Sequence, residues 1–359
     1  MIQGGFTPAV RGSRFAIRLT RLAVAPAIGM LFAACGGPNG PGPLPDAPVA
    51  ACPANVTVPG VVGGAQAVSY PAPSVTGGTQ PVSVTCSPGS GTTFTVGATT
   101  VSCTATDASA RTAQCTFTVT LTPALRLGIT TFMAFGDSFT EGEDGRSLRL
   151  VPHFIDPAGT YPFLLQGLLN NEYSGQAIQV LNYGRSGEAI DEGRQRLPGA
   201  LAGQHPQALL LLDGYNDLLA SCAESHPLDV ASAKCAQVTT DVVTGYRKMI
   251  QIAKAAGVAY VFASTLTPSG PYIPGPSVKN DRRIALSAIV ATNTKLVPMV
   301  RAEGATLVDS FAAFVGHEAE YVADDGLHPR RAGYQALANT FFAAIKNTIE
   351  STPAFGGVH

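Results

Sequence analysis

Side chains with nucleophilic, basic and hydrogen-bond-donating groups recur in four short motifs of this chain. The first motif is GDSFT at residues 136–140, where Ser138 follows directly on an apolar run. A serine at a strand-to-helix turn is exposed, and the N-terminus of the following helix stabilises negative charge that develops beside it. Thr140 stands where the GxSxG nucleophile elbow has its second glycine, so the motif is not that elbow. Taken alone, this motif is a weak signal, and a helix-capping serine explains it better.

Three further motifs supply an oxyanion site and a base. Gly187 ends the run NYGRSG, where glycines let backbone N–H groups approach a ligand, and Asn216 lies in GYND, where its amide is a donor for an oxyanion. Near the C-terminus, DGLHP places Asp325 three residues before His328, close enough for the carboxylate to fold back against one imidazole nitrogen and leave the other as a base. Each motif also has a structural explanation: a tight turn, an Asn/Asp turn, and a solvated Asp before a helix.

The elements that must position these motifs alternate between strand and helix. Apolar runs that predict buried parallel strands are Thr131–Phe135, Ile178–Leu181, Ala208–Leu212, Ala259–Ala263 and Thr306–Val308. Helical patterns occupy Tyr161–Asn170, Ala189–Leu201, Val238–Ala256, Arg282–Ala302 and Arg330–Ile349. Five such units predict an α/β fold with a doubly wound, five-stranded parallel sheet in a three-layer α/β/α sandwich. Functional residues of these sheets gather at the carboxyl ends of the strands, which is where the motifs stand.

Taken together, the four motifs resemble the SGNH, or GDSL, hydrolase family, over a domain that we place at residues 125–350. The resemblance implies a flavodoxin-like sheet and an ester hydrolase. It also implies Ser138 as the nucleophile, His328 as the base and Asp325 as the residue that orients His328. The N–H groups of Ser138 and Gly187, with the side chain of Asn216, would form the oxyanion hole. Neither a metal nor an organic cofactor is expected, and Asp217, next to the oxyanion asparagine, is interpreted as structural.

Residues 51–122 predict a separate small all-β domain. Val82, Val84 and Cys86 alternate with Ser and Thr, and the runs 52–58, 101–105 and 115–121 have the same period of two, which indicates a β-sandwich. These runs resemble the hyalin repeat, an immunoglobulin-like extracellular module. Ala110-Arg111 replaces the usual Gly-Asn turn, which puts the geometry of that turn in doubt. Adhesion or glycan binding is one interpretation of the module, and a spacer is the other.

The cysteines point to an exported protein. There are seven, at positions 35, 52, 86, 103, 115, 222 and 235. If Cys35 is set aside as a residue that carries a lipid, six cysteines remain. This even number predicts disulfides in an exported chain. Cys222 and Cys235 are expected to pair across an insertion after the third strand. Of the three pairings open to the other four, we prefer Cys86 to Cys103 with Cys52 to Cys115.

The first 35 residues have the pattern of a signal peptide. Four arginines precede an apolar run of 13 residues, Leu22–Ala34, and small residues then lead to Cys35 as in a bacterial lipoprotein signal. Phe32 departs from that pattern, and a plain secretory signal is the alternative. Residues 36–50 form a Pro/Gly-rich tether, and 351–359 a tail. We therefore expect an exported protein of the cell envelope, whose contact with the membrane is the lipid on Cys35.

Composition excludes other classes. The formal net charge is −1 with 13% charged residues, so a general nucleic-acid partner is not expected. A flavodoxin-like nucleotide binder needs a Gly-rich phosphate-binding loop after the first strand. Asp137 stands there instead and would repel a phosphate. A second alternative, a surface adhesion or glycan-binding lipoprotein with an idle hydrolase fold, would be favoured by a missing Ser, Asn or His, and none is missing. The ester substrate is not identified; the long connections Glu141–Thr160 and Thr267–Asn280 are candidate walls of its pocket.

Overall fold

The computed structural model describes residues 45–145, 155–223, 232–271 and 282–351. The predicted signal peptide, Cys35 and most of the predicted tether lie outside these residues. Within them, no helix is long and apolar enough to cross a membrane.

The N-terminal part is a β-sandwich of short strands. Its main sheet has the order β2 (Val56–Val61), β8 (Thr112–Pro123), β7 (Gly97–Thr106), β5 (Ser83–Ser87), with β2 parallel to β8 and the other pairs antiparallel. Two further pairs are antiparallel: β1 (Val49–Ala51) with β4 (Ser74–Thr76), and β3 (Ala65–Ala67) with β6 (Thr93–Thr95). The predicted all-β module is therefore confirmed.

Alternation along β7 and β8 builds the core of this sandwich. Val101 on β7 lies opposite Phe117 on β8 and both are buried, whereas the next pair in register, Ser102 and Thr116, is exposed. Tyr70 packs edge-on against the Phe117 ring at 4.9 Å between centroids. The expected apolar face of Val82, Val84 and Cys86 is wrong at Val84, which is 37% exposed. The reason is position, because β5 is an edge strand of the main sheet.

All three expected disulfides are formed. Cys52 bonds Cys115, Cys86 bonds Cys103, and Cys222 bonds Cys235. The first closes a loop with a sequence separation of 63 and therefore restricts the unfolded chain most. The third joins the end of α4 (Tyr215–Cys222) to the start of α6 (Ala233–Ala255).

A turn after β7 is held by one carboxylate. Asp107 is buried, and its oxygens accept from the N–H groups of Thr79, Ser109 and Arg111 at 2.8–3.0 Å and from the Arg111 guanidinium. Ala110 has a φ of +60°, in the left-handed region that a glycine would adopt more easily. The hydrogen bond from the Thr79 N–H, followed by those from Arg111 and Ser109, lowers the pKa of Asp107 from 3.8 to about 2, although burial opposes this.

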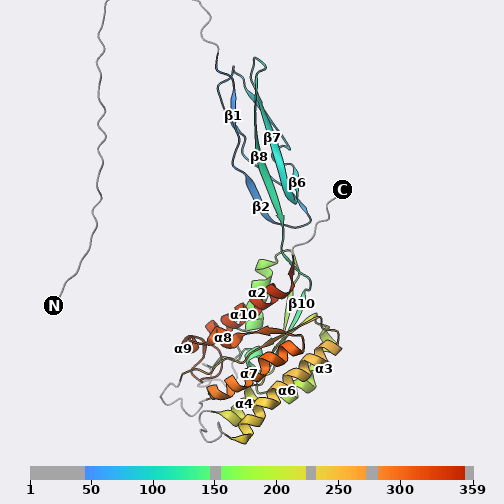
Figure 1. The fold of residues 1–359 in the computed structure, drawn as a ribbon, viewed down its shortest axis with the longest axis vertical. Helices are drawn as coiled ribbons and strands as arrows, with labels where there is room; N and C mark the ends of the chain where they lie inside the picture. Colours follow the sequence, from blue (N-terminus) through green and yellow to red (C-terminus); the bar gives the residue numbers. More distant parts are fainter. Residues whose placement is uncertain (1–44, 146–154, 224–231, 272–281, 352–359) are drawn as a thin grey trace, which may run out of the picture. The chain divides into compact units, whose positions relative to one another are not determined.

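The C-terminal part is the predicted three-layer α/β/α fold (Figure 1). Its five strands are β10 (Thr131–Gly136), β11 (Gln179–Gly184), β12 (Ala208–Leu212), β13 (Tyr260–Ser264) and β14 (Thr306–Val308). All pairs are parallel, in the order β11-β10-β12-β13-β14. Every residue of β12 is buried, as expected for a central strand covered on both faces.

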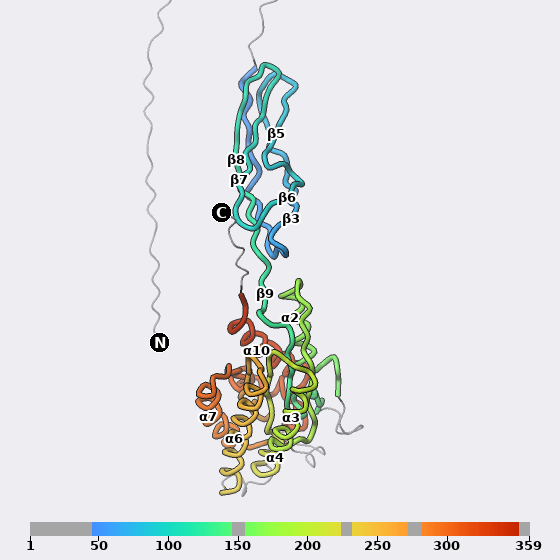
Figure 2. Tube along the Cα trace, turned by 90° about the vertical axis from the view of Figure 1, so that its right-hand side faces the viewer, coloured from blue at the N-terminus to red at the C-terminus, as the bar shows by residue number. Residues whose placement is uncertain are grey.

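Two layers of helices cover the sheet. On one face α2 (Tyr161–Glu172) packs against α10 (Arg331–Ile349), and α10 also contacts α8 (Ser310–Phe314). On the other face α7 (Leu286–Ala302), α6 and α3 (Ile190–Gln204) lie side by side in that order (Figure 2). Short helices α1 (Ser138–Glu141), α4 and α9 (Glu318–Tyr321) follow or precede functional segments at the carboxyl edge.

A two-stranded ribbon joins the two ends of this α/β unit. Strand β9 (Arg126–Leu127), which precedes β10, pairs antiparallel with β15 (Glu350–Ser351), which follows α10. The Tyr173 hydroxyl donates to the Glu350 carboxylate at 2.7 Å and supports the ribbon from α2.

Acid should unfold the sandwich through Asp107. Asp46 and Asp107 are the only carboxylates between residues 45 and 122. A carboxylate with a depressed folded pKa stabilises the fold above its ordinary pKa, and that contribution is lost as pH falls through the folded value. We expect the melting temperature of a fragment of residues 45–123 to fall between about pH 4 and pH 2. Asp107→Asn should melt lower at pH 7 and lose this dependence, whereas Asp46→Asn should keep it. A steep acid transition in Asp107→Asn would contradict the assignment.

Candidate active site

A sharp turn at the end of β10 presents Ser138. Gly136 has a φ of +154°, and a Cβ there would lie 1.7 Å from the Leu212 carbonyl oxygen, so only glycine fits between β10 and β12. Asp137 then caps α1, since its Oδ1 accepts from the Phe139 N–H at 3.1 Å. Ser138 is the first residue of that helix, and its N–H therefore has no intrahelical acceptor. The turn therefore places the Ser138 hydroxyl and the Ser138 backbone N–H donor close together.

Hydrogen-bond contacts join the side chains of Ser138, His328 and Asp325 in that order. The Ser138 Oγ lies 2.8 Å from the His328 Nε2, and the His328 Nδ1 lies 2.6 Å from the Asp325 Oδ2. The other Asp325 oxygen accepts from the N–H groups of Leu327 and His328, each at 3.0 Å. All three residues are buried. The centroid of the Phe139 ring lies 5.8 Å from the centroid of the His328 imidazole.

The ionisation of Asp325 fixes the form of the imidazole. Burial raises the pKa of Asp325, but the hydrogen bond and the charge of His328, with the two backbone N–H groups, outweigh it and hold the pKa below its ordinary value. An ionised carboxylate only accepts hydrogen bonds, so Nδ1 carries a proton toward Asp325. The lone pair of neutral His328 is then on Nε2 and faces the Ser138 hydroxyl.

The loop after β11 carries Gly187 to the same edge of the sheet. Gly187 has a φ of +80°, and a Cβ on it would meet open space, so the glycine is required by the turn. The Asn216 Nδ2, on α4, donates to the Glu188 carbonyl at 3.0 Å and so ties the asparagine to this loop. Gly184 allows close packing, since its Cβ would lie 2.0 Å from the Glu141 N.

The carboxylates of Glu188 and Asp217 hold the loop that carries Gly187 in place. Glu188 is buried and forms an ion pair with Arg196, whose Nη1 donates to the Tyr183 carbonyl at 3.1 Å and whose guanidinium lies 4.0 Å from the Phe135 ring. Asp217, which the sequence analysis interprets as structural, accepts from the Ile190 N–H at 2.8 Å. Helix α3 follows Ala189, which has no side-chain acceptor, so Asp217 supplies the cap from a different element.

Two further acids near Ser138, Asp137 and Asp213, are fully buried. Burial raises the pKa of Asp137 to about 7, against the lowering effect of N–H groups from Phe139 and Tyr215 and of His328. Burial, with the charge of Asp137, raises the pKa of Asp213 well above its ordinary value. Among the described residues, no hydrogen-bond partner is found for the Asp213 Oδ2. The upward shift favours the neutral form of Asp213, which reduces the charge buried in this apolar region.

The structure adds a residue that the motifs did not indicate. The Glu143 carboxylate lies beside the predicted base, with its Oε2 3.6 Å from the His328 Nε2, and its side chain is 3% exposed. Its Oε1 lies 3.2 Å from the Arg282 Nη1. Glu143 follows the nucleophile helix by two residues, but an acid in a loop carries no signal that it will meet a histidine near the C-terminus.

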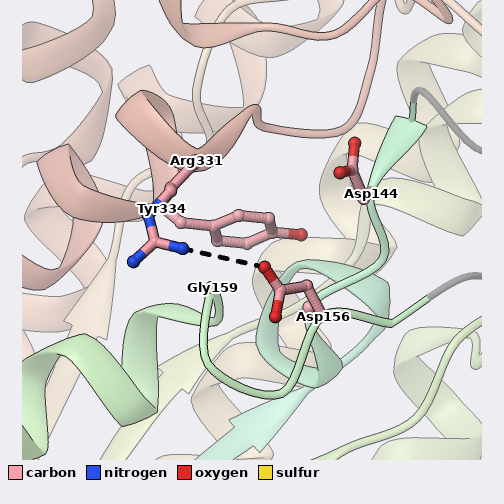
Figure 3. Close-up of a pocket in the computed structure, with 6 residues that line it drawn as sticks. Asp144, Asp156, Gly159, Arg331 and Tyr334 are labelled. Carbon is pink, nitrogen blue, oxygen red and sulfur yellow. Dashed lines mark ion pairs between the residues drawn. The ribbon is translucent and has the colours of Figure 1, made fainter.

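A small cavity lies against the same loop (Figure 3). It is lined by Asp144, Asp156 and Gly159 on one side and by Arg331 and Tyr334 of α10 on the other. Its volume is about 10 Å³, room for a single water molecule, so it is too small for a substrate. The Tyr334 hydroxyl donates to the Glu143 carbonyl at 2.8 Å and anchors the loop on α10.

Other expectations from the sequence lie partly outside the described residues. This holds for much of both predicted pocket walls, Glu141–Thr160 and Thr267–Asn280. Across the described ranges, no group of three or more His, Cys, Asp or Glu side chains is arranged to hold a metal ion.

Comparison with known proteins places these motifs in a family. The model of the GDSL-like lipase/acylhydrolase family matches residues 134–336, more than half of the chain, and that of the HYR domain matches residues 45–121. No curated protein matches the chain. Solved structures that match include TesA (23% identity, TM-score 0.42, covering 61% of this chain and 99% of that one). Others are a lipase/acylhydrolase from Enterococcus faecalis (18%, 0.45, 63% and 99%) and Axe2, an acetylxylan esterase from Geobacillus stearothermophilus (21%, 0.44, 61% and 94%).

Removing the Asp217 cap should loosen the loop that carries Gly187. We expect Asp217→Ala to lower the free energy of unfolding by about 1 kcal/mol, the usual cost of a lost helix cap. Urea denaturation measures this effect. Asp191→Ala on the same helix is the matched control, because its exposed ion pair with Arg194 should contribute little. Equal stability of the two variants would contradict a capping role for Asp217.

Proposed function

The chain belongs to the GDSL-like lipase/acylhydrolase family, and on this premise we propose that it is an exported serine carboxylic-ester hydrolase acting through an acyl-enzyme intermediate. One observation carries the proposal: the Ser138 Oγ, the His328 ring and the Asp325 carboxylate are joined by contacts of 2.8 and 2.6 Å at the carboxyl edge of the sheet. A hydroxyl is a weak nucleophile at neutral pH and needs such a base. An idle hydrolase fold has no use for this arrangement.

In the proposed reaction, the Ser138 Oγ attacks the ester carbonyl while its proton passes to the His328 Nε2. Asp325 stabilises the imidazolium through Nδ1 and keeps the ring in the reactive tautomer. The carbonyl oxygen becomes an oxyanion, for which the donors are the N–H groups of Ser138 and Gly187 and the side chain of Asn216.

The intermediate collapses when His328 returns its proton to the ester oxygen, and the alcohol departs. This leaves an acyl group on the Ser138 Oγ. Water then attacks the acyl carbonyl and gives its proton to His328, and the second collapse releases the acid and restores the serine hydroxyl. Every proton taken up in the cycle is returned, so the proposed reaction consumes one ester and one water per turnover.

Export and anchoring belong to the same proposal. Three disulfides support an oxidising compartment, because cytosolic thiols are kept reduced. The Arg-rich segment before Leu22 and the small residues before Cys35 support a lipidated N-terminus in the cell envelope. The substrate is an ester of acyl or acetyl type, carried by a polysaccharide or a lipid.

Active-site variants should separate the proposed roles. Ser138→Ala should abolish ester hydrolysis with the fold intact, and His328→Ala should be about as severe because the two residues act as a unit. Asn216→Ala should lower kcat by roughly 10²–10³, since two backbone donors remain. Asp325→Asn should lower kcat by favouring the wrong tautomer.

Labelling with a serine-directed fluorophosphonate, followed by mass spectrometry, checks the nucleophile. The wild type should take up one label at Ser138, and the Ser138→Ala protein none. A Ser138→Ala protein that still reacts stoichiometrically and hydrolyses p-nitrophenyl esters would place the nucleophile elsewhere.

Lipidation should depend on one thiol. In a bacterial host, the full chain should enter the detergent phase of a Triton X-114 partition, and Cys35→Ser should remain in the aqueous phase because the acceptor of the lipid is gone. The proportion of each protein in the two phases is measured by immunoblot. Aqueous partition of both proteins would remove the anchor from the proposal.

A further inference from the structure

A second carboxylate, that of Glu143, lies beside the imidazole nitrogen that faces Ser138. Glu143 pairs through its backbone with Ile155 in an isolated antiparallel bridge, and its side chain is turned inward to the His328 ring. The Glu143 Oε2 lies 3.6 Å from the His328 Nε2, the nitrogen that also faces the Ser138 hydroxyl. Nothing in the proposed reaction requires this second carboxylate.

Several contacts fix the position of this carboxylate. Its Oε1 lies 3.2 Å from the Arg282 Nη1, and its backbone carbonyl accepts from the Tyr334 hydroxyl at 2.8 Å. Two residues further on, Gly145 packs so closely that a Cβ there would lie 2.5 Å from the Asp325 Oδ1. The segment that carries Glu143 is therefore locked against both α10 and the loop of the predicted base. A carboxylate held in this way is preorganised and loses little entropy when it binds a partner.

The direction of proton transfer decides what this carboxylate meets. His328 must deliver its proton from Nε2 to the ester oxygen, which therefore comes within about 3 Å of that nitrogen. The Glu143 Oε2 lies 3.6 Å from the same nitrogen, so it is within reach of the atoms of the alcohol next to that oxygen. An ionised carboxylate accepts hydrogen bonds and donates none, and it repels another anion.

We propose that Glu143 determines the alcohol specificity, by accepting a hydrogen bond from a hydroxyl on the carbon adjacent to the one that bears the esterified oxygen. The preferred substrates are then esters of polyhydroxylated alcohols, and esters whose alcohol carries a carboxylate or phosphate are disfavoured. The inference rests on the proposed function, since it places the leaving alcohol by the proton that His328 returns to it.

The competing interpretation of this corner is a site for anionic alcohols at Arg282. The charge of that guanidinium is already compensated, because Nη1 is paired with the Glu143 Oε1, and its side chain is 28% exposed. The Glu143 carboxylate is more buried than the Arg282 guanidinium, and its Oε2 lies 3.6 Å from the proton-donating nitrogen. The local balance therefore favours a neutral, hydrogen-bond-donating alcohol.

Four acetate esters with different alcohols test the proposal on the wild-type protein. They are 1-acetylglycerol, propyl acetate, O-acetylglycolate and p-nitrophenyl acetate, so that the acyl group is constant. We expect kcat/KM for 1-acetylglycerol to exceed that for propyl acetate by about 10-fold or more, as for a hydrogen bond to a charged group. O-Acetylglycolate should be the poorest substrate. p-Nitrophenyl acetate reports on the basic machinery, because its leaving group needs neither a neighbouring hydroxyl nor a proton.

Two substitutions divide charge from hydrogen bonding. Glu143→Gln keeps an acceptor and removes the charge, so it should improve hydrolysis of O-acetylglycolate and retain part of the preference for 1-acetylglycerol. Glu143→Met should abolish that preference, measured within the variant as the ratio of kcat/KM for 1-acetylglycerol to kcat/KM for propyl acetate. Asp156→Asn, in the exposed ion pair with Arg331 on the same side of α10, is the matched control and should keep the wild-type profile.

The outcomes are distinguishable. Equal wild-type rates with 1-acetylglycerol and propyl acetate would overturn the inference even if no Glu143 variant folds. Variants that slow all four esters equally would mean that Glu143 acts on His328 alone, and a wild-type preference for O-acetylglycolate would assign the corner to Arg282. Failure to hydrolyse any of the four, p-nitrophenyl acetate included, would instead overturn the proposed esterase and the inference with it.

Discussion

The hydrogen bond between the Ser138 Oγ and the His328 Nε2 joins residues 190 positions apart, and no local sequence stabilises it. It exists because β10 lies inside the sheet, between β11 and β12, where the order of the strands reverses. The loops after these strands open toward one edge, and the segment before α10 returns to the same edge. The accuracy of the candidate site thus depends on the fully buried strands beneath it, above all β12.

The same edge concentrates acids that would be costly to bury alone. Glu188 is neutralised by Arg196 and Glu143 faces Arg282, while Asp137 is stabilised by N–H groups from two helices. Asp213 accepts from the Gly214 N–H through Oδ1, and burial with the charge of Asp137 raises its pKa, which favours its neutral form. This arrangement costs stability that an apolar core would not, and such costs are typical of sites shaped for chemistry.

The sequence predicts most of this fold because its signals are local. The apolar runs Ala208–Leu212 and Thr306–Val308 match β12 and β14 to the residue, and the spacing of Asp325 and His328 suffices to foresee their contact. Two features had no local signal. The exposure of Val84 follows from the edge position of β5, and the approach of Glu143 to His328 follows from tertiary packing. Periodicity describes the faces of an element and not the neighbours that it will acquire.

The pairing of β9 with β15 brings residues 126 and 351 side by side at the amino edge of the sheet, opposite the candidate site. The first and last strands of the hydrolase fold, β9 and β15, therefore lie together at this edge. A segment joined there need not cross the catalytic edge, whatever its size, so the unit suits combination with other modules in one polypeptide. In this chain the HYR sequence ends at residue 121, shortly before β9. The ribbon therefore connects the HYR sequence to the hydrolase fold and also holds the two ends of that fold together.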